Sequence, residues 1–199
     1  TYSAVDIENN KVATEDFVAY LKNPENWTTN GDIHTAKIVF SEDARYTFNL
    51  SYTDFAGNKS DEHEDYEFII DKTKPENLAI SYSTPFLDTI IDNLKFGFYN
   101  SPVEVTITAD DRSAGIDYVI YSYKVEAGSS PKNKGLTEQK VTSDNISYSN
   151  NGRTATVRFS IPPQYRGKVD FQVVDRAGNI SLFEDEKIVV VDNIAPGVT

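Results

Sequence analysis

The chain has 199 residues, of which 39% are hydrophobic and 12% aromatic. This is enough apolar material for packed cores and too much for a disordered chain. The formal net charge of −12 excludes nucleic-acid backbones and anionic membrane surfaces as natural partners, because both would be repelled. The absence of Cys excludes disulfides, thiolate metal sites and a cysteine nucleophile, and no apolar run reaches the roughly 18 to 20 residues of a membrane span.

Alternation of apolar and polar residues predicts short β-strands in the first third of the chain. We expect these strands over residues 2–7, 36–40, 46–52 and 66–70. Residues 17–21 fit either a short strand or a helical turn. The only Trp, Trp27, lies between loop-forming residues, and we expect it to cap the edge of a core; an exposed platform for a sugar is the alternative.

A similar pattern returns from about residue 76. It predicts strands over residues 78–82, 103–109, 116–125, 154–161, 168–175 and 187–191. Apolar residues with helical spacing over 86–98 predict one or two helical turns, and residues 127–152 fit an extended loop with one edge strand. Many short strands, frequent turn signals and no long helix predict an all-β sandwich.

Two stretches of the chain repeat one another. Asp54–Asn58 (DFAGN) returns as Asp175–Asn179 (DRAGN), and each is followed 17 residues later by an Asp that begins a Pro-containing segment, Asp71–Pro75 and Asp192–Pro196. Both pairs are 121 positions apart (54 to 175 and 71 to 192). Thr35–Ser41 also returns as Thr154–Ser160 at an offset of 119 (35 to 154). An internal repeat of this length predicts tandem structural units.

The repeat divides the chain into domains. We expect a first domain over residues 1–74 that lacks the first strands of its fold, a complete domain over 75–196, and the start of a further repeat at 197–199. The chain is then a piece of a longer array. A sandwich without its first strands would expose open strand edges.

These motifs resemble the tandem bacterial immunoglobulin-like domains of large surface proteins of Gram-positive bacteria. In the first unit the resemblance rests on Trp27, Asn30–Asp32, His34–Ala36, Tyr46–Phe48, Tyr52–Asn58 and Ile70–Pro75. In the second it rests on Val105–Asp110, Ser113–Ile116, Asp175–Asn179 and Val191–Pro196.

The resemblance implies an all-β fold of tandem immunoglobulin-like β-sandwiches in an extracellular protein, at the bacterial cell surface or secreted. It implies a non-catalytic role as a stalk, spacer or adhesion module. The partners would be neighbouring repeats of the parent chain and a host or glycan ligand, with no nucleic acid and no membrane insertion in this fragment.

Calcium is the cofactor for which the sequence offers candidate ligands, because hard cations prefer several oxygen ligands. Two candidate sets are Asp54, Asn58 and Asp71, and Asp175, Asn179 and Asp192, and the second set would gain Asp110 and Asp111 if their turn lies at the same end. The alternative, which we favour, is that these side chains accept hydrogen bonds from turn backbone, since no continuous calcium-loop signature is present. We therefore assign no metal, cofactor-binding or catalytic residue.

The sequence offers few candidate catalytic residues. His34 begins a strand, His63 lies in the acidic loop Asp61–Asp65, and no pair of carboxylates is singled out by its spacing. We predict that the chain is not an enzyme. An intramolecular Lys–Asn cross-link, as in some Gram-positive surface domains, stays open.

The alternative function is that of a carbohydrate-binding accessory module of a secreted glycan-degrading enzyme. Such a module needs two or three aromatic side chains on one exposed face. Trp27, Tyr148 and Tyr165 are the candidates.

Overall fold

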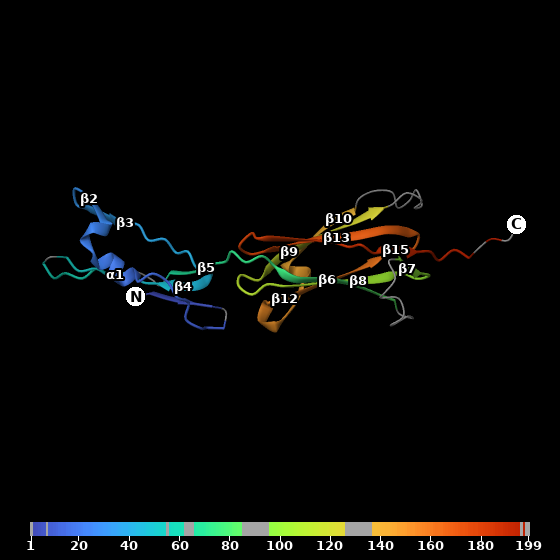
Figure 1. Ribbon diagram of the computed structural model, residues 1–199, viewed down its shortest axis with the longest axis horizontal. Helices are drawn as coiled ribbons and strands as arrows, with labels where there is room; N and C mark the ends of the chain where they lie inside the picture. The colour runs from blue at the N-terminus through green and yellow to red at the C-terminus, as the bar shows by residue number, and fades with distance from the viewer. Residues whose placement is uncertain are drawn as a thin grey trace. The chain divides into compact units, whose positions relative to one another are not determined.

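The computed structural model describes residues 2–6, 8–54, 56–61, 66–84, 96–125, 137–195 and 197. In this part of the chain strands dominate and helices are few and short, so the predicted all-β class is confirmed (Figure 1). None of the helices among these residues has the length and apolar character needed to cross a membrane. The chain forms two compact units, Thr1–Thr73 and Lys74–Thr199.

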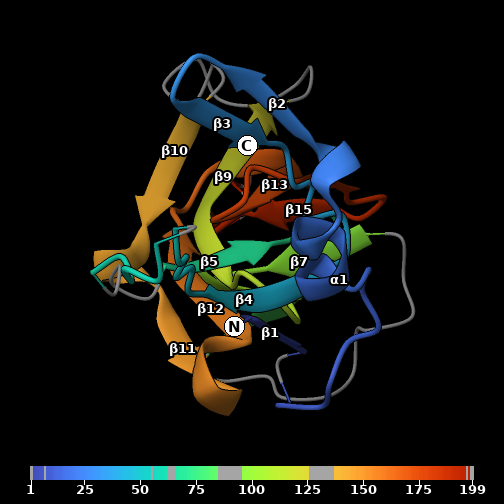
Figure 2. The same ribbon diagram turned by 90° about the vertical axis from the view of Figure 1, so that its left-hand side faces the viewer.

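The first unit contains a three-stranded antiparallel sheet and a separate hairpin. The sheet has the order β1-β4-β5, and the hairpin pairs β2 with β3 (Figure 2). The elements are β1 (Tyr2–Val5), α1 (Phe17–Lys22), η1 (Pro24–Asn26), β2 (Trp27–Asn30), β3 (Ile33–Ala36), β4 (Ala44–Phe48) and β5 (Tyr66–Ile70). Within this sheet β1 and β5 are therefore the edge strands.

Of the two structures expected near residue 17, the helix is the one that forms. Oδ1 of Asp16 accepts hydrogen bonds from the backbone N–H groups of Val18 (3.1 Å) and Ala19 (3.0 Å). It thereby satisfies two of the donors that the start of a helix leaves unpaired. The helix buries Phe17, which is 3% exposed, and ends where Pro24 begins a 3₁₀ turn.

Aromatic rings close the small core of the first unit. Its buried residues Ala4, Ala44 and Tyr46 lie on the sheet. The Phe40 ring contacts four other rings at centroid distances of 4.9 to 5.7 Å, with interplanar angles of 65° to 78°; they are Phe17, Tyr46, Phe48 and Phe68. Such edge-to-face contacts are the arrangement that ring quadrupoles prefer. Phe40 is thus the centre of the packing in this unit.

The second unit consists of two sheets that enclose one core. The larger sheet has the order β10-β9-β13-β15-β7, with β14 also paired to β13, and the smaller has the order β11-β12-β8-β6 (Figure 1). All pairs are antiparallel except that of β15 with β7. The strands are β6 (Glu76–Ser83), β7 (Phe96–Tyr99), β8 (Val103–Asp110), β9 (Ile116–Val125), β10 (Thr137–Thr142), β11 (Ser147–Ser149), β12 (Thr154–Ile161), β13 (Tyr165–Asp175), β14 (Ile180–Glu184) and β15 (Ile188–Val191).

Strict alternation of buried residues builds this core. Val103, Val105 and Ile107 on β8 face Val169 and Val173 on β13, and each of these side chains is at most 1% exposed. Full burial of one such side chain contributes about 1.5 to 3 kcal/mol. Because the chain has no Cys, apolar packing of this kind must hold the two sheets together without disulfides.

The two units share one strand arrangement at an offset of 121 residues. In the first unit the pairs include Ala44↔Ile70, Ala4↔Tyr46 and Thr53↔Lys59, and in the second unit they include Tyr165↔Val191, Val125↔Gly167 and Val174↔Ile180. Each pair of the first list becomes a pair of the second when 121 is added to both numbers. The sequence repeat is therefore also a repeat of strand register.

Of the strands predicted in the first unit, one is absent and one is shorter than expected. The strand expected over residues 36–40 is absent, since β3 ends at Ala36 and the next strand begins at Ala44. Its counterpart β12 is held between β8 and β11, and the described residues of the first unit include no equivalent of β8. The strand expected over 46–52 ends at Phe48, because the second half of β13 depends on β9 and β14 for its pairing.

Other differences concern the second unit. Residues 96–99 form β7, so the predicted helical turns are wrong there, and residues 86–95 lie outside the described residues. The predicted loop over 127–152 contains two strands, β10 and β11, instead of one, and residues 127–136 are not described. Strands β2 and β14 were not predicted. Residues 62–65, 196, 198 and 199, on which His63 and most of the expected further repeat fall, also lie outside the described residues.

Candidate functional site

The first copy of the repeated motif folds into a turn around one carboxylate. Oδ1 of Asp54 accepts hydrogen bonds from the backbone N–H groups of Ala56 (2.9 Å) and Asn58 (2.8 Å). Oδ2 accepts a hydrogen bond from the side-chain amide of Asn58 (2.8 Å). Both oxygens of the carboxylate therefore serve the turn.

The second copy repeats this geometry. Oδ1 of Asp175 accepts from the backbone N–H groups of Ala177 (2.9 Å) and Asn179 (2.8 Å), and Oδ2 accepts from the Asn179 amide (2.8 Å). The residue before the Asn has a positive φ in both turns, +87° at Gly57 and +90° at Gly178. Glycine adopts this backbone at no steric cost, which explains its place in the motif.

A third turn of the same kind lies at Asp6–Asn10. The sequence predicts a turn at Asn9–Lys11, but its likeness to the repeated motif was missed. Oδ1 of Asp6 accepts from the N–H groups of Glu8 (2.8 Å) and Asn10 (2.8 Å), and Oδ2 accepts from the Asn10 amide (3.0 Å). Asn9, with a φ of 65°, stands where the other turns have Gly. The signal was available as an Asp followed four residues later by an Asn that has Gly or Asn before it.

These hydrogen bonds confirm the structural interpretation of the motif, in which its side chains stabilise turn backbone. The donors favour the charged carboxylate, and they lower the pKa of Asp54 below its usual value, first through the side-chain amide of Asn58 and then through its backbone N–H. The side-chain amides of Asn58 and Asn179 each donate a hydrogen bond to the Asp of their own turn, so both side chains stabilise the turn.

The fold does not bring together the candidate calcium set of Asp175, Asn179 and Asp192. Val191 pairs with Tyr165 at the start of β13, whereas Asp175 ends that strand, so Asp192 and Asp175 lie at opposite ends of it. A strand of this length separates them by roughly 30 Å. In the first unit the register places Ile70, next to Asp71, opposite Ala44 at the start of β4, whereas Asp54 follows the other end of that strand in the chain.

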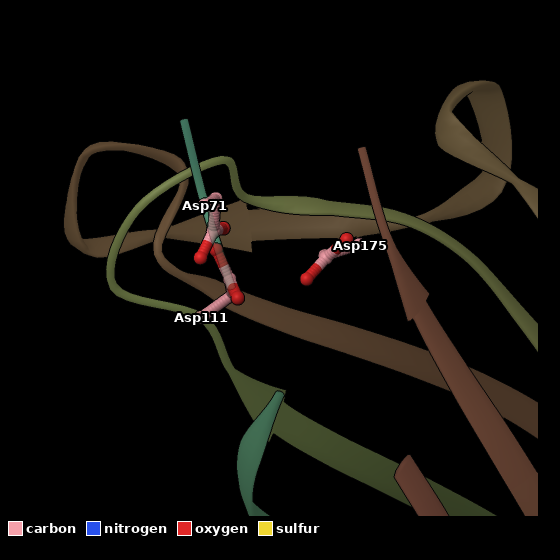
Figure 3. Close-up of side chains that lie close together, drawn as sticks. All are labelled: Asp71, Asp111 and Asp175. Carbon is pink, nitrogen blue, oxygen red and sulfur yellow. The ribbon is translucent and has the colours of Figure 1, made fainter. Parts of the chain in front are cut away.

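Asp111 does lie at the same end of the second unit as Asp175, which was the condition for grouping the two. Asp111 and Asp175 both belong to the second unit, each is 1% exposed, and a carboxylate oxygen of one lies within 4.8 Å of one of the other (Figure 3). The backbone N–H of Arg176 donates to the carbonyl of Gly115 (3.0 Å) and ties the two turns together. Figure 3 also labels Asp71, which belongs to the first unit.

Asp110 does not join this pair. Its Oδ1 accepts from the Thr154 hydroxyl (2.7 Å) and its Oδ2 from the Asn77 amide (2.9 Å). It therefore links β8 to both neighbouring strands of the smaller sheet. Both of its carboxylate oxygens therefore accept hydrogen bonds within the smaller sheet, and Asp110 does not extend the candidate set.

The chemistry of the Asp111–Asp175 pair follows from its surroundings. Oδ1 of Asp111 accepts from the N–H groups of Ser113 (3.2 Å) and Gly115 (2.5 Å), so this carboxylate organises its turn as Asp175 does. Together the two buried carboxylates offer oxygen ligands to a cation. Calcium takes six to eight oxygen ligands, however, and two carboxylates supply a minority of them.

The three candidate aromatics for sugar binding turn their polar groups toward backbone. Tyr165 is 4% exposed, and its hydroxyl donates to the carbonyl of Lys168 (3.0 Å). Tyr148 and Trp27 are half-buried, and they donate to the carbonyls of Ile116 (3.0 Å) and Leu21 (2.8 Å). Tyr165 therefore cannot act as an exposed platform, and the other two are held as structural side chains.

His34 stands on the exposed β2–β3 hairpin. Its Nδ1 forms a hydrogen bond with the hydroxyl of Thr29 (2.9 Å) across the two strands. Such a cross-strand pair stabilises a hairpin. This contact gives His34 a structural role.

Comparisons with known proteins add little to this geometry. No protein-family model matches the chain, and no curated protein matches it either. Among solved structures, the chain is similar to a DUF4466 family protein from Parabacteroides merdae ATCC 43184, with 12% sequence identity, over 54% of this chain and 42% of that one. The TM-score is 0.28, so this likeness carries no argument about fold or function.

Proposed function

We propose that the chain is a non-catalytic module of tandem immunoglobulin-like β-sandwiches from a bacterial cell-surface or secreted protein. Its role is that of a stalk, a spacer or an adhesion module, with neighbouring repeats and a host or glycan ligand as partners. The observation that supports this most is the 121-residue repeat, whose strand registers agree in both units. Units that repeat along a chain extend it by simple addition, which is what a stalk requires.

The repeated side chains support a structural role. In both copies the Asp and Asn of the motif accept or donate hydrogen bonds within their own turn, as at Asp54 and Asp175. A motif retained in two units for its turn, rather than for a ligand, suits a module whose shape is its function.

The alternative is a carbohydrate-binding module of a secreted glycan-degrading enzyme. Two observations make this alternative less favourable. Tyr165 is buried, and Tyr148 and Trp27 donate hydrogen bonds to backbone carbonyls. Because Trp27 is the only Trp, its fluorescence gives a direct test: quenching by soluble sugars would favour the alternative, and an unchanged emission would favour the surface module.

The deciding experiment is a binding screen of the 199-residue chain against immobilised glycans and extracellular-matrix proteins, with calcium and with a chelator. A specific, saturable hit assigns the adhesive role, and no hit in either condition assigns the spacer role. A hit that the chelator abolishes implicates a metal. In that case the Asp111→Asn variant should lose the hit, while Asp110→Asn, whose carboxylate is engaged elsewhere, should keep it.

A further inference from the structure

The outer face of the larger sheet in the second unit carries exposed apolar side chains. On β14, Ile180 is 42% exposed and Leu182 is 72% exposed, and on β7 Phe98 is 63% exposed. All three point away from the core, because the residues that alternate with them, such as Gly97 and Phe183, are directed inward. Surface of this kind, when it is contiguous, marks interaction sites.

The outer face of the smaller sheet is different. Its outward positions on the described strands hold no large apolar side chain. On β8 and β12 these positions are Glu104, Thr106, Thr108, Asp110, Thr154, Thr156, Arg158 and Ser160. Within the described strands of the second unit, apolar exposure is therefore confined to one of the two outer faces.

Charged residues cross the outer face of the larger sheet in two neighbouring bands. Along β13 the outward positions are, in order, Arg166, Lys168, Asp170 and Gln172. Glu184 on β14 lies opposite Asp170 and shares its face. A basic band of Arg166 and Lys168 therefore lies next to an acidic band of Asp170 and Glu184, and successive outward positions are about 6.6 Å apart.

Apolar residues flank these bands at both ends. At the basic end, Val190 and Phe98 share a cross-strand row with Arg166. At the acidic end, Leu182 lies opposite Gln172. The two halves of the face therefore have opposite charge and the same apolar character.

This order is complementary to itself under a twofold rotation. The axis lies in the interface, at right angles to the strands and at the level of Val169, and it brings the basic band of one copy over the acidic band of the other. The same rotation brings Leu182 of one copy over Val190 and Phe98 of the other. In such an interface every contact occurs twice. A partner of uniform charge would match only one of the two bands.

The size of the face indicates a weak contact. The outward positions from Arg166 to Val174 span about 26 Å, and the strands β9, β13, β15 and β7 span about 19 Å in the other direction. This is roughly 500 Å² per copy, or roughly 1,000 Å² for both, which is near the lower limit of a specific interface. The net charge of −12 on each copy also opposes association, although salt screens this repulsion. The expected state is a reversible dimer at high protein concentration.

We propose that the outer face of the larger sheet is a contact surface for a second copy of this chain, which packs against it face to face across a twofold axis. The apolar positions at both ends exclude water, and the paired bands fix the direction in which the copies lie. The contact uses strands of the second unit alone. It is independent of whether the module acts as a spacer or as an adhesin.

The first test is sedimentation equilibrium of the 199-residue chain from about 10 μM to about 1 mM at physiological salt. We expect the weight-average mass to rise from that of one copy, 22.3 kDa, toward that of two. Leu182→Glu places a charge against the apolar row of the partner copy and should raise the dissociation constant about tenfold. Because Leu182 is exposed, this variant should keep its fold, which far-UV circular dichroism checks.

Charge reversal tests the pairing of the bands. Lys168→Glu and Glu184→Lys should each raise the dissociation constant about tenfold, and the double variant should return to within about threefold of the wild type. Glu104→Lys, on the outer face of the smaller sheet, is the matched control. It changes the net charge from −12 to −10 (−12 + 2), as Glu184→Lys does, and it should not weaken the dimer.

Any of three results would overturn the proposal. One is a mass that stays at 22.3 kDa up to the highest concentration. Another is a double variant that associates as weakly as the two single variants. The last is equal weakening by Glu104→Lys and Glu184→Lys, which would assign the association to net charge or to another surface.

Discussion

The repeated sequence segments Thr35–Ser41 and Thr154–Ser160, which contain Phe40 and Phe159, adopt different structures. Phe159 lies within β12 and stacks on Tyr121 of the other sheet, at a centroid distance of 3.8 Å and an interplanar angle of 4°. Phe40 lies outside any strand and packs edge-on against four rings. The difference follows from the neighbours: β12 has β8 beside it, and the described residues of the first unit offer no such strand.

This comparison teaches how a repeat unit with fewer strands is held together. The second unit fills its core from two sheets, with β-branched residues such as Val157 and Val173 in alternation. In the described residues of the first unit, a three-stranded sheet forms one side of the core, and rings from irregular segments and from α1 close it. Fewer buried side chains then carry the stability of that unit, so each of them matters more.

The largest expected effect comes from removing the central ring of the first unit. Phe40→Ala should destabilise that unit by about 2 to 4 kcal/mol, because four aromatic contacts are lost at once. Urea unfolding followed by Trp27 fluorescence reports the first unit alone, since the second has no Trp. Phe159→Ala is the matched control and should leave the Trp27 transition unchanged. If both variants shifted that transition equally, Phe40 would not be the centre of the first core.

Sequence reasoning succeeded where structure depends on local pattern. The alternation in β8 and in β9 predicted those strands closely, and the offset of 121 predicted the shared register. It failed at residues 36–40, because a strand also needs a partner strand that no local pattern reveals. It failed at residues 96–99 for a related reason, since β7 is defined by its pairing with β15.

The candidate site shows the same division. The turn role of Asp54 and Asp175 was predictable, because the hydrogen bonds are made within five consecutive residues. The grouping of Asp175 with Asp192 was wrong, because equal spacing in two repeats says nothing about which end of a strand a residue reaches. The nearness of Asp111 to Asp175 depends on two turns from different sheets, and the sequence could state it only as a condition.

The Asp175 turn should contribute more to the stability of its unit than the Asp54 turn does. Asp175→Ala removes a buried acceptor of three hydrogen bonds and should cost the second unit about 2 to 3 kcal/mol. Asp54→Ala removes the same bonds at an exposed position and should lower the thermal midpoint of the first unit by less. Far-UV circular dichroism and Trp27 fluorescence separate the two transitions. A larger effect at Asp54 would contradict the role of burial.

Substitution of the turn glycine, Gly57 or Gly178, should destabilise its unit by a similar amount in both copies. Gly178→Ala should cost about 1 to 2 kcal/mol because of the left-handed backbone alone, since no atom within 4 Å would meet the added Cβ. Gly178→Asn should cost less, because Asn9 already holds a φ of 65° in the equivalent place of the first turn. If denaturant unfolding gave the same loss of stability for Gly178→Ala and Gly178→Asn, the left-handed backbone would not be the cause of the destabilisation.

The smallest expected effect is a pH dependence confined to the first unit. The hydrogen bonds from Asn58 lower the folded-state pKa of Asp54 below its usual value, so the folded state binds this proton less readily than the unfolded state does. The stabilisation is therefore fully present above the unfolded pKa and is lost as the pH falls through the folded pKa. The urea midpoint reported by Trp27 should drop below about pH 4 more steeply in the wild type than in Asp54→Asn, which cannot titrate there. Because the other carboxylates are the same in both proteins, the difference between the two curves isolates Asp54, and parallel curves would show that its hydrogen bonds do not stabilise the unit.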